Sequence, residues 1–315
     1  MVFKRIKFFS FFAFSAVCGL FLLSCSNGGS TDKKNAVDTV QAFPFPEIPS
    51  LITDVEHRMN YLLQNYWNNF DFTDSVMQKQ ADVAEQGLVD FLSLLSSDDV
   101  SDWLIKESID NFCVKMEAYP LSRKLFMENI DRYLYNPDSP CYNESLYTVY
   151  LNRMLESRFI DEDSKLSLKF RLSLIQRNNP GDTATDFTYF LPDGSKRTLM
   201  QTDTGEGRLL IIFYDPFCTS CQQIMSHLIE NNSLREWVRD KKLTVLAVYT
   251  EDSLEDWRSS ISHMPADWIV AHDNMVIKDK ALYDLKAMPS LYLLDRNKKV
   301  ILKDASASAV LKALY

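Results

Sequence analysis

The spacing of apolar residues divides the chain near residue 180. From Leu51 onward, apolar side chains recur every three or four positions, the period of helices with one buried face. Pro120 is suited to the first turn of the fourth segment. Helical segments are predicted at about 51–70, 88–95, 100–116, 121–135, 144–159 and 162–176. Because no segment is typical of a strand, residues 51–178 are predicted to form an all-α domain.

After the turn-rich stretch 178–182 the pattern changes to that of strands. The apolar runs 209–214 and 243–249 are typical of central strands buried on both faces. Hairpins are predicted over 187–199 and 290–303, a short strand at 268–271, and helices at 218–239, 253–261, 277–285 and 306–315. Residues 180–315 are therefore predicted to be an α/β domain with a mixed sheet and flanking helices, in a multidomain protein.

The first 24 residues have the pattern of an export signal. Three positive charges precede an apolar run from Phe8 to Leu23, and Leu22-Leu-Ser-Cys25 resembles a bacterial lipobox. This predicts a signal peptide over 1–24 and a lipid on Cys25; the alternative is a transmembrane anchor, for which the run is short. Residues 25–50 are predicted to be a flexible tether. The expected location is the cell envelope, lipid-anchored and facing the periplasm, at the outer membrane rather than the inner.

The charge of the chain limits the partners it can have. The net charge is −9, and it becomes −12 without residues 1–24, because 31 basic residues then face 43 acidic ones. Such a surface argues against nucleic acid or an anionic lipid surface as a partner. A composition of 46% hydrophobic residues suits a globular protein with real cores.

The candidate chemistry lies in the pair Cys218-x-x-Cys221. Cys218 follows the predicted strand 209–214 and begins a helix, whose free N–H groups and dipole favour a thiolate. We therefore expect a lowered pKa for Cys218 and greater exposure than for Cys221. Cys221 lies three residues on, close enough to resolve a mixed disulfide formed at Cys218.

Two other interpretations of this pair fit the sequence less well. A zinc site would need a second pair of ligands at similar spacing, and none is present, so no metal is expected. A structural disulfide would close a very small loop and stabilise little. The only redox group expected is the Cys218–Cys221 disulfide itself. In the helical domain, Cys113 is expected to be a buried thiol and Cys141 to lie in a loop; a disulfide between them stays open.

Met288-Pro289-Ser290 precedes the predicted strand 291–294, seventy residues after Cys218. Together with the cysteine pair, this resembles the thioredoxin superfamily, and within it the exported, membrane-anchored thiol-disulfide reductases of the TlpA and ResA type. The resemblance implies a nucleophilic Cys218, a resolving Cys221, a cis Pro289 and a substrate-contacting Met288. The alternative for Pro289 is an ordinary turn proline. The helical domain resembles a family of unknown function found before such domains in exported lipoproteins.

Three departures from thioredoxin leave the direction of electron flow open. Phe217 stands where thioredoxins usually carry Trp, Thr219-Ser220 contains no proline, and the strand 209–214 has no acid; Asp215 or Glu206 could substitute for it. The predicted function is a periplasmic, lipid-anchored thiol-disulfide oxidoreductase, with a reductase favoured. Its expected partners are protein thiols and disulfides of the envelope, and a membrane electron donor if it is a reductase. The alternative is a redox-inactive scaffold whose helical domain binds a partner protein.

Overall fold

The computed structural model describes residues 42–314, which belong to a single compact unit. The predicted signal peptide, the predicted lipid site at Cys25 and most of the predicted tether lie outside these residues. Within residues 42–314, no helix is both long and apolar enough to cross a membrane.

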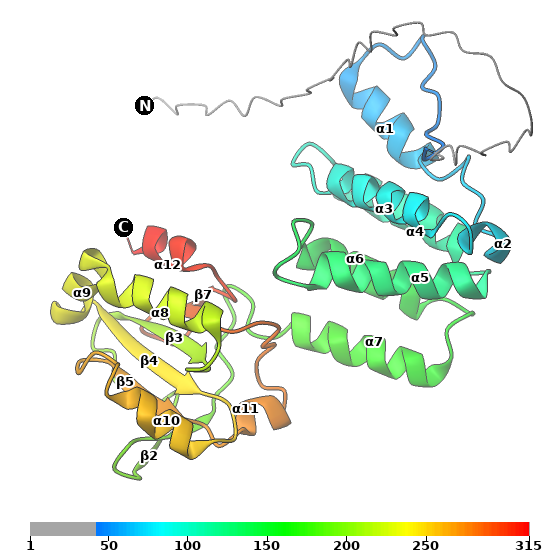
Figure 1. Cartoon of the computed structure of the whole chain (residues 1–315). Coiled ribbons are helices and arrows are strands. Elements are labelled where there is room, and N and C mark those ends of the chain that lie inside the picture. The colour runs from blue at the N-terminus through cyan, green and yellow to red at the C-terminus, as the bar shows by residue number, and fades with distance from the viewer. Residues whose placement is uncertain (1–41, 315) are drawn as a thin grey trace, which may run out of the picture. The chain divides into compact units, whose positions relative to one another are not determined.

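The N-terminal part is all-α, as the apolar period predicted (Figure 1). Its helices are α1 (Val55–Asn65), α2 (Asp74–Met77), α3 (Ala81–Leu95), α4 (Asp102–Met116), α5 (Pro120–Ile130), α6 (Glu144–Leu155) and α7 (Glu162–Ile175), with a π-helical turn η1 (Asp131–Tyr135) after α5. Side-chain oxygens of Asp54, Ser101, Asn143 and Asp161 cap four of these helices. The single-turn α2 was not predicted, because four residues are too short to show a period.

One aromatic cluster forms the centre of this helical core. The ring of Trp67 lies 4.9 Å from that of Phe112 and 5.4 Å from that of Phe126. Phe43 also belongs to the cluster: it is 7% exposed, and its ring lies 5.1 Å from that of Tyr66. Phe43 precedes the predicted domain start at residue 51, so the packed part of the helical domain begins within the segment predicted to be a tether.

The C-terminal part is built on one seven-stranded mixed sheet in the order β2-β1-β5-β4-β3-β6-β7. Its strands are β1 (Thr188–Phe190), β2 (Lys196–Thr198), β3 (Arg208–Tyr214), β4 (Leu243–Tyr249), β5 (Ile269–His272), β6 (Ser290–Leu294) and β7 (Val300–Leu302). The runs of apolar residues in β3 and β4 place these strands at the centre, where they pair in parallel. β6 pairs antiparallel with β3, so the start of β6 lies beside the end of β3.

Helices cover both faces of this sheet (Figure 1). On one face, alternate residues of β3 and β4 pack against α8 (Thr219–Glu230), α9 (Asn232–Arg239), α10 (Leu254–Ile261) and α12 (Ala307–Ala313). On the other face the remaining alternate residues pack against α11 (Val276–Asp279), Phe187 and Tyr283. The predicted mixed sheet with flanking helices is confirmed.

In the helical part, α3 begins at Ala81, well before the predicted start at 88. In the C-terminal part, two helix predictions were wrong in extent. The helix expected over 218–239 is interrupted at Asn231, whose side chain accepts a hydrogen bond of 2.9 Å from the N–H of Leu234 and so starts α9. The helix expected over 277–285 stops at Asp279, and Ala281 then adopts a left-handed φ of 47°. A left-handed residue cannot continue an α-helix. The chain from Lys280 to Pro289 is consequently a loop.

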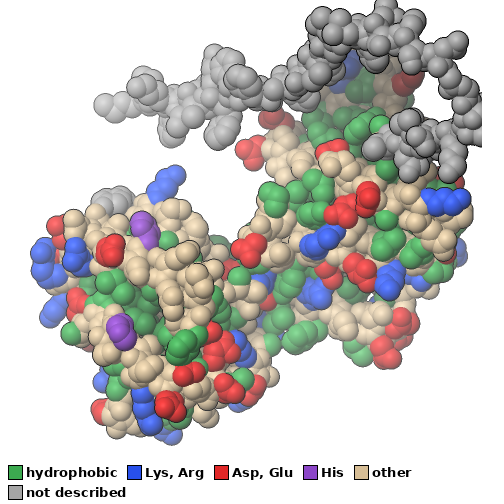
Figure 2. Space-filling model, viewed as in Figure 1, with side chains coloured by type: hydrophobic (Ala, Val, Ile, Leu, Met, Phe, Trp, Pro, Cys, Tyr) green, Lys and Arg blue, Asp and Glu red, His purple; other side chains and the backbone are tan. Residues whose placement is uncertain are grey.

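Acidic and basic side chains are interspersed over the face drawn in Figure 2. The negative net charge is therefore not gathered into one large acidic patch on this face.

Candidate redox site

The cysteine pair follows the end of β3 and lies at the start of α8. The strand ends at Tyr214, a turn follows over 215–217, and Cys218 occupies the N-cap position of α8 with an extended backbone. The turn is closed by the N–H of Cys218, which donates to the carbonyl of Asp215 at 3.2 Å. This is the strand–cysteine–helix arrangement predicted from the apolar pattern.

The two thiols have different surroundings. Cys218 is half-buried and Cys221 is 1% exposed, which confirms the predicted order of exposure. Burial raises the pKa of Cys221 to about 12, in spite of a hydrogen bond of 3.4 Å from the backbone N–H of Asp215 to its sulfur. Cys221 is therefore held as a thiol, whereas Cys218 is the sulfur that a substrate can reach.

The residue before the predicted proline lies next to the accessible sulfur. The Met288–Pro289 peptide bond is cis, as the resemblance implied. The Cys218 thiol donates to the carbonyl oxygen of Met288, with the sulfur 3.6 Å from that oxygen. The pairing of β6 with β3 accounts for this proximity, because it brings Ser290 opposite Phe213 and so carries Met288 to the end of β3.

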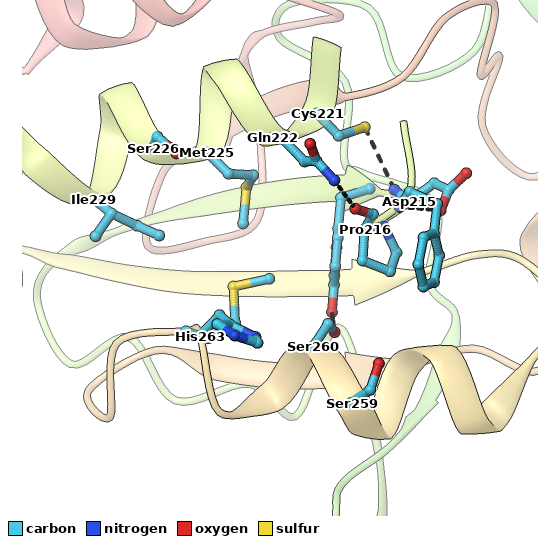
Figure 3. Close-up of a pocket in the computed structure, with 13 residues that line it drawn as sticks. Asp215, Pro216, Cys221, Gln222, Met225, Ser226, Ile229, Ser259, Ser260 and His263 are labelled. Atoms are coloured by element: carbon cyan, nitrogen blue, oxygen red, sulfur yellow. Dashed lines mark hydrogen bonds between the residues drawn. The ribbon is translucent and has the colours of Figure 1, made fainter. Parts of the chain in front are cut away.

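A cavity of about 400 Å³ opens beside Cys221, between α8 and α10 (Figure 3). Met225 and Met264 contribute apolar walls, and Phe217, 65% exposed, stands at its edge. The side-chain amide of Gln222 donates to the carbonyl of Pro216 at 2.7 Å and holds the turn before Cys218. The lining is thus mainly apolar beside the sulfur, and methionine side chains adapt to ligands of varied shape. The sequence pattern did not indicate this cavity, because its walls come from separate helices.

The two acids considered as substitutes for the missing strand acid differ in position. Asp215 lies beside the pair, where its carboxylate accepts the N–H of Phe217 at 2.9 Å. Glu206 precedes β3 at the opposite end of the strand and forms an ion pair with Arg296. Glu206 is therefore not part of the site. Among the described residues, no group of three or more His, Cys, Asp and Glu side chains is arranged to hold a metal ion.

The other two cysteines in the described part of the chain, Cys113 and Cys141, lie in the helical domain. Cys113 is fully buried, and burial raises its pKa. Cys141 is half-buried, with its sulfur 3.8 Å from the hydroxyl of Ser93. Both are free thiols in this structure, so the disulfide left open by the sequence is not formed.

The structure also places a buried ionic cluster behind the site, which the sequence did not reveal. Lys286 lies two residues before Met288, and its side chain is only 3% exposed. Its closest partner, Glu144, lies 142 positions away in the helical domain, so no spacing in the sequence could have indicated this pairing.

Comparison with known proteins agrees with this geometry. A family model described as thioredoxin-like matches residues 208–300, and a domain of unknown function matches residues 24–178. The crystal structure of a thioredoxin-like protein from Bacteroides caccae is 34% identical, covers 88% of this chain and 99% of its own, and superimposes with a TM-score of 0.75. The chain belongs to the thioredoxin-like family.

Two further solved structures resemble the C-terminal part alone. The C-terminal domain of an uncharacterized protein from Bacteroides fragilis is 37% identical, covering 44% of this chain and 97% of its own, with a TM-score of 0.42. A domain of a "possible thiol-disulfide isomerase" from Cytophaga hutchinsonii is 26% identical, covering 44% and 92%, with a TM-score of 0.37. None of the curated proteins matches the chain.

Proposed function

We propose that this thioredoxin-like protein is a thiol-disulfide oxidoreductase in which Cys218 attacks and Cys221 resolves. The observation that carries the proposal is the placement of the two sulfurs. Cys218 is accessible at the start of α8, 3.6 Å from the carbonyl of Met288, while Cys221 is buried behind it as a thiol. One reactive and one reserved thiol are what a two-step exchange requires.

The exchange begins when the Cys218 thiolate attacks one sulfur of a substrate disulfide. A Cys218–substrate bond forms, the substrate disulfide breaks, and the leaving sulfur takes up a proton. Cys221 then loses its proton to water or to Asp215 and attacks Cys218. The second substrate thiolate leaves and is protonated. Two electrons have passed to the substrate, and the protein holds the Cys218–Cys221 disulfide, which a dithiol donor must reduce before the next turnover.

The backbone of Met288 and the cavity beside Cys221 would contact the substrate. In this proposal Met288 and Pro289 border an extended substrate segment at Cys218, and the cavity between α8 and α10 receives an apolar side chain of that segment. The substrates are protein disulfides of the bacterial envelope. The protein works as a reductase that is anchored through a lipid on Cys25, faces the periplasm and is recharged by a membrane electron donor.

Trapping of thiols in growing cells tests this function. Acid quenching followed by alkylation gives the oxidation state of Cys218 and Cys221 in the wild type and in a Cys218→Ser strain. We expect a mostly reduced pair in the wild type, and mixed disulfides with envelope proteins in a Cys221→Ser strain. Cys141→Ser is the matched control and should trap nothing.

The outcomes separate the alternatives. A mostly oxidised pair with trapped partners would retain the exchange chemistry but reverse the direction of electron flow. A pair that never cycles and never traps a partner would overturn the proposal in favour of a redox-inactive scaffold.

A further inference from the structure

The loop that carries Met288 to the site is held by the helical domain. This loop, residues 280–289, is here called the proline loop; it joins α11 to β6 and has no regular structure of its own. Directly after α7, Arg177 donates to the carbonyl of Ala281, and the Asn178 amide donates to the carbonyl of Leu282 at 3.0 Å. The first residues of the proline loop are therefore fixed by the end of the helical domain.

Lys286 fixes the second half of the same loop. Its ammonium nitrogen lies 2.6 Å from an oxygen of Glu144, the first residue of α6, and 2.9 Å from an oxygen of Asp284. The same nitrogen lies 5.1 Å from the centre of the Tyr135 ring. A lysine with a side chain 3% exposed has little access to water, so these partners replace its hydration.

Glu144 connects the proline loop to a second point of the C-terminal domain. Its other oxygen lies 3.2 Å from the ammonium of Lys303, which follows β7. Tyr135 adds a link, since its hydroxyl donates to Asp284 at 2.7 Å. One carboxylate at the start of α6 therefore pairs with both lysines, Lys286 in the proline loop and Lys303 after β7.

The far side of the cluster reaches the residue after Pro289. Asp304 accepts a hydrogen bond of 2.6 Å from the hydroxyl of Ser290, and its second oxygen lies 3.8 Å from the Lys286 nitrogen. The segment Met288–Ser290 thus has Lys286 of the ion cluster before it, and Asp304 of the same cluster binds its last residue. In this segment, the carbonyl oxygen of Met288 accepts a hydrogen bond from the Cys218 thiol.

From these contacts we infer that Glu144 of the helical domain, acting through Lys286, is a positioning residue for Cys218, because it sets the place of the Met288 carbonyl against that thiol. The inference deepens the proposed function and rests on it: the helical domain would tune the attacking cysteine without touching the substrate. A purely structural role for the ion cluster would instead affect stability and leave the behaviour of Cys218 unchanged.

Glu144→Gln is the variant that tests the inference, because it removes the charge and keeps the shape of the side chain. Glu117→Gln is the matched control. Glu117 lies 3.0 Å from Arg153 in another partly buried ion pair of the helical domain, and among the described residues its side chain bonds to Arg153 and not to the proline loop. Both variants are made in the full chain, and the alkylation rate of Cys218 by iodoacetamide is followed by mass spectrometry from pH 5 to 9.

We expect Glu144→Gln to raise the alkylation rate of reduced Cys218 at neutral pH at least threefold and to move its pH profile to lower pH. The reason is that a displaced Met288 carbonyl no longer accepts the thiol proton, and the site gains one net positive charge. Glu117→Gln should leave rate and profile unchanged. Lys286→Gln, a second variant, should change both as well. Hydrogen exchange of the proline loop should accelerate in Glu144→Gln and not in the control.

An unchanged profile and unchanged loop exchange in Glu144→Gln would overturn the inference, as would equal shifts in Glu144→Gln and Glu117→Gln. The alkylation rate needs no substrate or electron donor. A wild-type protein that lacks disulfide exchange would therefore contradict the proposed function, while the response of Cys218 to Glu144→Gln would still decide the role of the ion cluster.

Discussion

Cys221 should react far more slowly in the folded protein than in the unfolded chain. Its pKa is raised to about 12 by burial, against about 8.5 for an ordinary thiol. At pH 8 its thiolate fraction is then about 10⁻⁴ instead of about one quarter, a loss of roughly 2,000-fold. A more basic thiolate is a better nucleophile, and a Brønsted slope of about 0.45 over 3.5 units restores roughly 40-fold. The net expectation is a rate about 50-fold lower, before any steric protection.

The measurement uses Cys218→Ser, so that Cys221 is the only cysteine of the pair. Iodoacetamide is added at pH 8 to the folded protein and to the protein unfolded in urea, and modification of the Cys221 peptide is timed by mass spectrometry. Each cysteine is compared with itself, which removes differences in local sequence. Cys218 in Cys221→Ser serves as the accessible control and should show a much smaller ratio of unfolded to folded rate.

A folded rate for Cys221 within a few-fold of its unfolded rate would refute this reasoning. Such a result would mean that the sulfur is not buried in the reduced protein, and that nothing reserves it for the second step of the exchange. The assignment of attacking and resolving roles would then have no physical basis.

Three further predictions concern stability. Phe43→Ala should lower the free energy of unfolding by about 3 kcal/mol in urea titrations followed by tryptophan fluorescence, because it leaves a cavity in the aromatic cluster; a loss below about 1 kcal/mol would mean that this segment is not docked. Gly207→Ala should cost about 1–3 kcal/mol and lower the melting temperature, since its Cβ would lie 2.7 Å from the Lys242 carbonyl; an unchanged melting temperature would contradict this. Burial raises the pKa of Glu144, but the ion pairs with Lys286 and Lys303 lower it by more, so the pKa lies below its ordinary 4.5. These ion pairs therefore stabilise the fold above about pH 4.5, and their contribution is lost as the pH falls further. Glu144→Gln should thus lower the free energy of unfolding by about 3 kcal/mol at pH 7, and the difference in this free energy between the variant and the wild type should shrink by pH 3.5. A difference that stays constant with pH would contradict this prediction.

The parts of the fold that depend on local periodicity could be predicted from the sequence. The run Leu209–Tyr214 is apolar at every position, and it forms the central strand whose end presents Cys218. Turn and cap chemistry was harder to anticipate. Asn231 divides a continuous apolar helix pattern because its side chain starts a new helix, and Ala281 ends a helix through a left-handed conformation that alanine rarely adopts.

Features made by distant residues could not be predicted at all. Glu144 and Lys286 are separated by 142 positions, and each alone has the pattern of an ordinary surface charge. Phe43 stands in a proline-rich stretch whose composition is typical of a linker. Its ring is buried because Gly87 has no side chain: a Cβ at Gly87 would lie 2.2 Å from the Phe43 ring. The cysteine pair could be found from the sequence because its chemistry is local. The inferred influence of the helical domain on this pair depends on distant residues, so the sequence could not indicate it.

The shared ion cluster also limits how the two domains can be recombined. A chimera that joined this C-terminal domain to another helical domain would have to supply a carboxylate where Glu144 stands, together with a hydroxyl for Asp284. Without them, Lys286 would lose its shortest ion pair and keep only Asp284 and Asp304 of its own domain as charged partners. The two domains are therefore expected to be inherited as a matched pair and exchanged between proteins only together.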